Sequence, residues 1–170
     1  MSRDSEMTFR IREAAPSDSA RLAALVRALN QHQGDPSDHF NEATLERDVF
    51  GPDACLGALI AEGAGGLIGY AFFHDGYESA YAARGVYLCD LYVVSEARRN
   101  GVGRALVAAV AKRAKARGRT FLWWVSRGWN EEARKFYASL GVANEPVMAH
   151  ALTFSAFETL AVAGKQRGDA

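Results

Sequence analysis

Cysteine, net charge and long hydrophobic stretches are all scarce in this sequence. Cys55 and Cys89 are the only cysteines among 170 residues, too few for a disulfide framework and without the spacing of zinc ligands. The four histidines are equally scattered, so we expect no metal site. No hydrophobic stretch approaches the roughly 20 residues that span a bilayer, and residues 1–7 are polar, unlike a signal peptide. We therefore expect a protein of the reducing cytoplasm with no membrane partner.

The charge balance argues against a nucleic-acid partner. Lysine and arginine number 20, and aspartate and glutamate also number 20, so the whole protein has no field that attracts an anionic polymer. The basic residues between 112 and 119 lie at the end of a predicted helix, where cations suit the negative end of the helix dipole. We interpret them as a solvated helix end rather than as a nucleic-acid patch.

Two common nucleotide-binding motifs are missing, but a phosphate-binding turn is present. The sequence has no Gly-Lys-Ser/Thr, and no Gly-x-Gly-x-x-Gly with an acid about 20 residues later. It has an Arg-x-x-Gly-x-Gly turn between a hydrophobic strand and a helix. Arg98, Arg99 and Arg104 supply cationic donors there. Gly101 and Gly103 let an anion approach the backbone N–H groups that begin the helix. An ordinary turn with solvated arginines is the alternative.

The pattern of hydrophobic residues predicts one compact domain, residues 1–170, in which strands and helices alternate. With 49% hydrophobic and 24% charged residues, the chain can bury a sizeable core. Strands are predicted at residues 8–13, 55–62, 67–74, 86–94, 121–125 and 147–154, the fifth of them buried. Helices are predicted at residues 16–33, 41–50, 102–117 and 131–140, and a Ser155-x-x-Glu158 capping box predicts a short terminal helix. Residues 75–84 are expected to form a loop, and residues 1–7 and 164–170 to fray.

A second motif, WNEEARKFYASLGV at residues 129–142, follows the strand predicted at 121–125. Together with the arginine–glycine turn, it resembles the GCN5-related N-acetyltransferase (GNAT) superfamily, in which both motifs occur in this order and at this separation. The resemblance extends from residue 9 to about residue 154. It is closest to the diamine (spermidine/spermine) acetyltransferase branch, through GVYLCDLYVV, the Trp129-Asn130 pair and the Phe136-Tyr137 pair.

The resemblance implies a mixed α/β (α+β) fold: a single GNAT-like domain whose central mixed sheet splays open between two neighbouring strands and is flanked by helices. It also implies acetyl-CoA as co-substrate, with its pyrophosphate in the turn and its pantetheine arm along the strand before the turn. A homodimer is expected from the family as well. The residues that the resemblance assigns to acetyl-CoA are Leu91, Tyr92, Val93, Arg98, Arg99, Asn100, Gly101, Val102, Gly103, Arg104, Asn130 and Phe136.

Tyr137 is the general acid that the resemblance implies, giving a proton to the departing thiolate. A phenol has an ordinary pKa of about 10, so the site must lower that pKa or couple the transfer to bond breaking. Packing is the alternative role, because Tyr137 lies on a hydrophobic helical stripe with Phe136 and Leu140. Asn130 has an alternative role too, as the N-cap of the same helix.

The acceptor side differs from the pattern of the diamine branch. That branch carries adjacent Glu and Asp residues on the strand before the turn, whereas this sequence has Cys89 and Asp90. A buried thiol cannot replace a carboxylate charge unless its pKa falls well below about 8.5, so polyamine specificity is left open. Asp90 is the candidate base, although adjacent strand residues point to opposite faces, so Asp90 need not occupy the place of the missing acid. Cys89, Asp90, Tyr81 and Trp129 are the candidate substrate-binding residues.

Together these residues predict an N-acetyltransferase. It would move the acetyl group of acetyl-CoA to a primary amine of a small molecule, diamine-like or amino-acid-like, by direct attack on the thioester. An enzyme that acts on a protein N-terminus or on lysine is one alternative. A regulatory module that binds acyl-CoA without turnover is the other.

Overall fold

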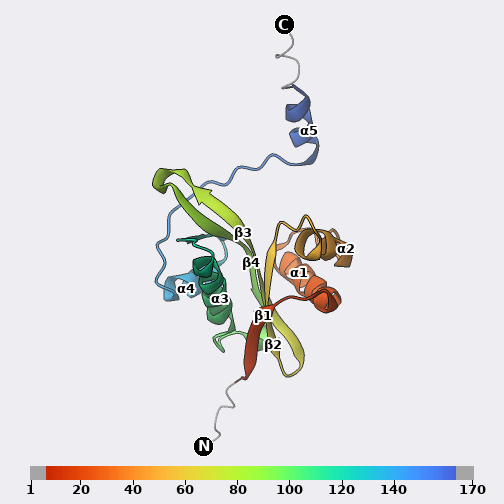
Figure 1. The fold of residues 1–170 in the computed structure, drawn as a ribbon, viewed down its shortest axis with the longest axis vertical. Helices are drawn as coiled ribbons and strands as arrows, with labels where there is room; N and C mark the ends of the chain where they lie inside the picture. The colour runs from red at the N-terminus through yellow and green to blue at the C-terminus, as the bar shows by residue number, and fades with distance from the viewer. Residues whose placement is uncertain (1–6, 164–170) are drawn as a thin grey trace, which may run out of the picture. The chain divides into compact units, whose positions relative to one another are not determined.

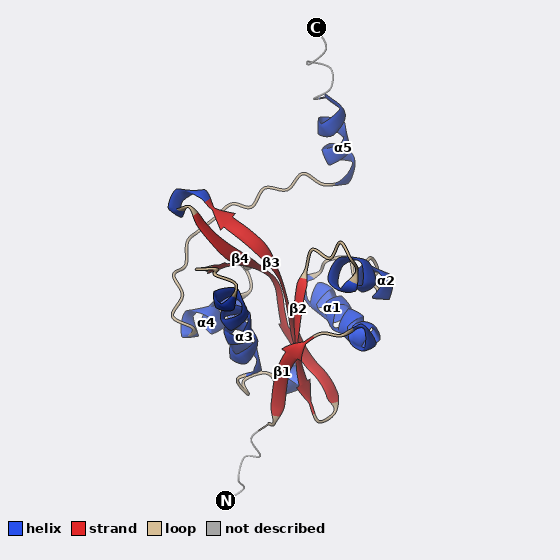
Figure 2. Ribbon diagram, in the orientation of Figure 1, coloured by secondary structure: helices blue, strands red, loops and turns tan. Residues whose placement is uncertain are grey.

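The computed structural model describes residues 7–163, which fall into two compact units that divide after Arg127. The first unit holds a five-stranded sheet in the order β1-β2-β3-β4-β5 (Figure 2). Its strands are β1 (Phe9–Glu13), β2 (Gly57–Gly63), β3 (Gly66–Glu78), β4 (Ala83–Val93) and β5 (Leu122–Trp123). The first four strands are antiparallel to their neighbours, and β5 is parallel to β4.

Helices cover both faces of this sheet (Figure 1). The helices α1 (Ser19–Gln33) and α2 (Glu42–Leu45) lie on one face, and α3 (Val102–Ala116) lies on the other. Short 3-10 turns at Pro16–Asp18 and Ser95–Ala97 come before α1 and α3. The mixed sheet between helices confirms the predicted fold class.

A hydrophobic core lies between α1 and the sheet. Along α1 the buried residues recur at helical spacing, and they include Leu22, Val26 and Leu29. Tyr70 and Phe72 of β3 belong to the same cluster of buried side chains. Burying a large hydrophobic side chain stabilises the fold by roughly 1.5–3 kcal/mol. A polar side chain on this face of β3 or β4 is therefore surrounded by hydrophobic residues and needs a polar partner.

The second predicted helix is interrupted. Asn41 caps α2 as predicted, because its Oδ1 accepts a hydrogen bond from Thr44 N at 3.1 Å. From Glu46 to Phe50, however, the chain forms a π-helical turn rather than a continued α-helix. The Asp48 carbonyl oxygen accepts backbone hydrogen bonds from Cys55 and Leu56 at 3.0 and 2.9 Å. In a continued α-helix that carbonyl would face Pro52, which has no N–H, so the following segment supplies its donors instead.

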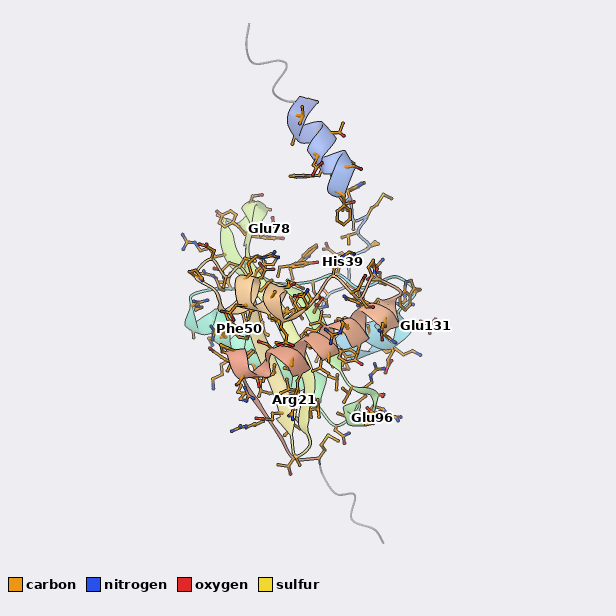
Figure 3. The ribbon with its side chains drawn as sticks, turned by 90° about the vertical axis from the view of Figure 1, so that its right-hand side faces the viewer. Arg21, His39, Phe50, Glu78, Glu96 and Glu131 are labelled. Atoms are coloured by element: carbon orange, nitrogen blue, oxygen red, sulfur yellow. The ribbon has the colours of Figure 1, made fainter. Side chains whose placement is uncertain are left out.

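The loop predicted at residues 75–84 is wrong, because the hairpin of β3 and β4 continues through it. Only a 3-10 turn at Ser79–Tyr81 separates the two strands. Arg119 donates to both carboxylate oxygens of Asp75, at 3.1 and 2.5 Å, and so links the hairpin to the segment after α3. This contact comes from a residue far along the chain, so the local sequence did not reveal it. Glu78 lies near the tip of the hairpin, at the opposite end of the sheet from Glu96 (Figure 3).

The strand predicted at residues 121–125 is shorter and less buried than expected. β5 contains two residues, Leu122 and Trp123, which pair with the first half of β4. Trp123 is 50% exposed and Val125 is 43% exposed. A run of bulky hydrophobic residues predicts a buried strand, but here the run lies at the edge of the sheet, where one side has no neighbour.

The second unit contains α4 (Glu131–Ser139) and α5 (Phe154–Ala163) among its described residues. The strand predicted at residues 147–154 is absent: the segment before α5 forms no ladder with described residues, and Met148 is 80% exposed. The capping-box prediction is also wrong, because α5 begins at Phe154 and Ser155 lies inside its first turn. Fraying was expected for residues 1–7 and 164–170, and all of these except Met7 lie outside the described residues.

Candidate active site

Much of β4 has no partner strand on the side away from β3. Within residues 7–163, β5 provides partners only for Val86 and Tyr87. Val94 N donates to a β3 carbonyl oxygen at 3.0 Å, so the backbone of Val94 points towards β3. Because these orientations alternate along a strand, the backbone groups of Val93 and Leu91 point to the open side. This opening is the expected splay, at the strand segment predicted to hold the pantetheine arm.

The arginine–glycine turn is tied to the end of β4. Arg98 Nε donates a hydrogen bond to the Val93 carbonyl oxygen at 3.1 Å. The backbone is left-handed at Arg99, with φ 64°, and at Gly101, with φ 81°. Left-handed backbone costs a residue with a side chain roughly 1–2 kcal/mol, which explains the glycine at position 101. Arg99 carries that strain, a feature that clusters at ligand-binding turns.

The start of α3 presents backbone donors beside this turn. Its first helical hydrogen bond runs from Ala105 N to the Gly101 carbonyl oxygen at 2.9 Å. The N–H groups of the first turn precede that bond, so the helix itself gives them no acceptor. With the positive end of the helix dipole they favour an anion. The buried side chains of Ala97 and Val102 anchor the turn on either side, and this donor set fits a diphosphate group.

A β-bulge lies at Cys89, in the middle of β4. Phe72 of β3 pairs with Asp90, and the next residue, Phe73, pairs with Leu88, so Cys89 is the additional residue. Side chains do not alternate regularly between the two faces of a sheet at a bulge. Cys89 and Asp90, although adjacent, therefore need not point to opposite faces. Instead, pairing with Phe72 places Asp90 on the face of the sheet that packs against α1.

Asp90 is a half-buried carboxylate that has one hydrogen-bond partner, and no cation beside it, in the described part of the chain. The hydroxyl of Tyr70, which is fully buried, donates to Asp90 Oδ2 at 3.1 Å. Among residues 7–163, no lysine, arginine or histidine forms an ion pair with Asp90. Burial raises the pKa of Asp90, and the Tyr70 hydrogen bond offsets only part of that rise. Asp90 is therefore an unusually basic carboxylate whose second oxygen has no partner among these residues.

Tyr70 is locked in place by its ring neighbours. It pairs with Tyr92 across the ladder, so Asp90 is its diagonal neighbour on the same face. The ring of Tyr70 lies 4.8 Å from that of Phe72 and 6.3 Å from that of Tyr92, centroid to centroid. Burial and the charge of Asp90 raise the pKa of Tyr70 far above its usual range, so its hydroxyl remains a proton donor to Asp90.

Cys89 is exposed, contrary to the buried thiol that was expected. Removal of water from the thiol by its neighbours, with the charge of Asp90, raises the pKa of Cys89 to about 11. The thiol is therefore neutral at pH 7 and supplies no negative charge. The acceptor side of the site consequently carries one carboxylate, that of Asp90, where the diamine branch has two.

The remaining predicted residues lie outside this cluster. Tyr81 is in the turn at the tip of the β3–β4 hairpin and is 83% exposed. Trp129, Asn130, Phe136 and Tyr137 belong to the second unit. There Asn130 Oδ1 accepts a hydrogen bond from Ala133 N at 3.0 Å and caps α4, as its capping interpretation predicted. The rings of Phe136 and Tyr137 lie 5.2 Å apart on the half-buried stripe of α4.

Comparison with known proteins identifies the family of the chain. The model of the acetyltransferase (GNAT) family matches residues 22–142, which include the turn, the open strand and α4. The chain belongs to the GNAT acetyltransferase family. This acetyltransferase is 32% identical over 141 residues to thialysine N-epsilon-acetyltransferase of Bos taurus, covering 77% of the chain and 82% of the relative. It is 33% identical over 84 residues to a D-amino-acid N-acetyltransferase of Saccharomyces cerevisiae, covering 49% and 52%.

A solved structure agrees with the fold. An integron cassette protein of V. cholerae superposes with a TM-score of 0.76 at 21% identity, covering 91% of this acetyltransferase and 98% of that chain. The family and the fold predicted from the two motifs are thus confirmed, and the protein is an acetyl-transferring enzyme. Enzymes of this family use acetyl-CoA as co-substrate, and the open β4 edge and the turn fit that molecule.

Residues 7–163 contain no cluster of three or more His, Cys, Asp and Glu side chains placed to hold a metal ion. None of the helices in that range has the length and hydrophobicity to cross a bilayer.

One candidate functional residue, Tyr70, was not identified from the sequence. Tyr70 lies in a predicted strand that is hydrophobic at almost every position, where a tyrosine indicates only a place in the core. Its contact with Asp90 depends on the pairing of β3 with β4 and on the bulge at Cys89. The only signal along the chain was that a single charged residue within a hydrophobic strand needs a polar partner.

Proposed function

We propose that this acetyltransferase transfers the acetyl group of acetyl-CoA to a primary amine of a small molecule. The observation that carries the proposal is the state of Asp90. Its carboxylate is basic and half-buried, has no cation beside it within residues 7–163, and lies on the strand that leads into the anion-binding turn. A buried charge without a counter-charge is costly, and a substrate ammonium group would supply one. The relatives named for thialysine and D-amino acids act on small amines, which supports this class of acceptor.

Acetyl-CoA supplies an acetyl group activated as a thioester. The diphosphate would lie in the turn, held by Arg98, Arg99, Arg104 and the N–H groups that begin α3, with Asn100, Gly101, Val102 and Gly103 forming the backbone of that turn. The amides of the pantetheine arm would pair with the open edge of β4 at Leu91, Tyr92 and Val93. In the second unit, Asn130 and Phe136 are proposed to contact the same arm, by the family's pattern.

Asp90 has two roles in this proposal. Its carboxylate pairs with the ammonium group of the acceptor and orients it, and the same oxygen then accepts a proton from that group. A raised pKa makes Asp90 a stronger base than an ordinary aspartate, and this lowers the free-energy cost of moving a proton from the ammonium group to the carboxylate. Holding both reactants in one geometry contributes as well, since well-oriented reactions reach effective molarities of about 10⁵ M or more.

Tyr137 is proposed as the general acid that donates a proton to the departing thiolate of coenzyme A. Its place on the half-buried stripe of α4 also suits packing, so the role rests on the family's pattern rather than on a contact. Trp129 and Tyr81 are kept as proposed contacts of the acceptor.

The test is thiol release from acetyl-CoA across a panel of amines. Turnover on small primary amines, lost in Asp90→Asn while acetyl-CoA still binds, would support the proposal. Faster turnover on peptide N-termini or peptide lysines would assign the enzyme to protein acetylation. Tight binding of acetyl-CoA with no turnover on any amine would leave a non-catalytic acyl-CoA-binding module.

A homodimer and a cytoplasmic location complete the proposal. The dimer is supported by α5, whose hydrophobic side chains Phe154, Phe157, Leu160 and Val162 are between 58% and 85% exposed. Sedimentation of the purified protein at twice the mass of the 18.4 kDa chain would agree with it, and sedimentation at the monomer mass would overturn it.

A further inference from the structure

Three aromatic rings from three neighbouring strands form a continuous row. His74 of β3 and Tyr87 of β4 have ring centroids 5.3 Å apart, and Tyr87 and Trp123 of β5 are also 5.3 Å apart. Both pairs are tilted by 37°. His74 is exposed, Trp123 is 50% exposed and Tyr87 is half-buried, so the row offers ring surface to a ligand.

This aromatic row lies on the same face of the sheet as Asp90. His74 and Phe72 are two residues apart on β3 and therefore share a face, and they pair with Tyr87 and Asp90. Two residues of a strand span about 6.7 Å. The bulge thus places the carboxylate one step along the sheet from the row. Burial raises the pKa of Tyr87, and so do Cys89, which is charged only at high pH, and Asp90; this agrees with that proximity.

The charges around the row set what it can bind. Asp90 is the carboxylate beside it, and Cys89 is neutral at pH 7. A ligand with one ammonium group can pair that group with the carboxylate of Asp90, and the rest of the ligand can then contact the ring faces of the row. A second ammonium group would find no second acid at Cys89, in contrast to the adjacent acids of the diamine branch.

We infer that His74, Tyr87 and Trp123 form a subsite for the body of the acceptor, and that the acceptor is a primary monoamine carrying a flat, hydrophobic group a short linker away. The ammonium group pairs with Asp90 while the flat group stacks on the row. Stacking of two aromatic rings contributes about 0.5–1.5 kcal/mol beyond the burial of their area, and cationic groups are also attracted to ring faces. This inference rests on the proposed function, because it names the acceptor of the same site.

The experiment compares three amines under saturating acetyl-CoA. The probes are 2-phenylethylamine, n-butylamine and putrescine, which differ in the ring and in the second charge. The wild-type enzyme is expected to show a kcat/KM for 2-phenylethylamine at least tenfold above that for either other amine. Trp123→Ala should lower that value about tenfold, mainly through KM, and leave n-butylamine within about twofold, since one aromatic contact corresponds to about a factor of ten.

Two further variants keep the test decisive. His74→Ala removes an exposed ring of the row with little risk to folding, and it should raise KM for 2-phenylethylamine severalfold. Tyr77→Ala removes another exposed ring, 65% accessible, from the same strand but outside the row, and should leave turnover of all three amines unchanged. Circular dichroism and sedimentation establish that each variant keeps its fold and its oligomeric state.

The outcomes distinguish a failure of the proposed function from a failure of the subsite. No turnover on any amine overturns the proposed function, and the subsite with it. Turnover in which putrescine or n-butylamine equals or exceeds 2-phenylethylamine overturns the subsite and leaves the proposed function intact. Equal losses on all three amines in Trp123→Ala and His74→Ala, or a change of sedimentation in either, would assign the row to folding or assembly and also overturn the subsite.

Discussion

Tyr70 donates a hydrogen bond from its buried hydroxyl to Asp90 Oδ2, across 3.1 Å. This bond joins β3 to β4 beside the bulge, and it occupies one carboxylate oxygen while the other has no partner within residues 7–163. We therefore propose Tyr70 as a positioning residue. It holds the carboxylate in one orientation and moderates the rise in pKa that burial causes.

Replacing Tyr70 with phenylalanine should shift the pH dependence of the enzyme. The hydrogen bond stabilises the charged form of Asp90, so its loss raises the pKa of Asp90 further. The acidic limb of the profile of kcat/KM against pH should move to higher pH, with a loss of about tenfold on that limb and recovery at high pH. Tyr77→Phe removes a hydroxyl from an exposed position on the same strand and should leave the limb in place. An unmoved limb in Tyr70→Phe would show that the bond does not act on the base.

Asp90→Asn should separate stability from activity. The folded-state pKa of Asp90 is raised, so the free energy of unfolding falls as pH rises from the unfolded pKa to the folded pKa, and it stays at the lower level above that. The variant should therefore melt at a higher temperature than wild type at pH 8, and the difference should vanish at a pH below the unfolded pKa of about 3.9. Its turnover should fall about 10²- to 10⁴-fold. Thermal unfolding at both pH values is the measurement, and a lower melting temperature at pH 8 would contradict the uncompensated charge.

Gly101→Ala should weaken the binding of acetyl-CoA. The left-handed φ of 81° costs an alanine roughly 1–2 kcal/mol, and relief of that strain would turn the backbone of the anion-binding turn. We expect a dissociation constant about tenfold higher by calorimetry. Gly118→Ala is the matched control, because Gly118 has a φ of 70° and, like Gly101, open space where the Cβ would stand. It should lose similar stability and bind acetyl-CoA normally; weakened binding in both would indicate general destabilisation instead.

Tyr137→Phe tests the proposed general acid. If the phenol supplies a proton, turnover should drop about 10²-fold or more with acetyl-CoA binding retained. If Tyr137 only packs on the stripe of α4, phenylalanine keeps the ring and the rate stays near that of wild type. Single-turnover kinetics beside calorimetry distinguishes the two, and a normal rate with normal binding removes the assignment.

The errors of the sequence predictions share a physical cause. The segment at 147–154 and the run at 121–125 have the composition of buried strands, yet a strand needs a neighbour to pair with, and composition does not specify one. Residues 75–84 have the composition of a loop, yet Arg119 holds Asp75 and the hairpin continues. In each case contacts between distant parts of the chain outweighed local propensity.

The sequence by itself determined the local structural features and the protein family. The N-caps at Asn41 and Asn130, the glycine in the turn at position 101 and the buried stripe of α1 follow from interactions within a few residues, and the paired motifs identified the family. The tertiary structure alone decided the chemistry beside Asp90. The bulge at Cys89 and the contact with Tyr70 depend on the register between two strands, and a shift of one residue would turn each side chain to the other face.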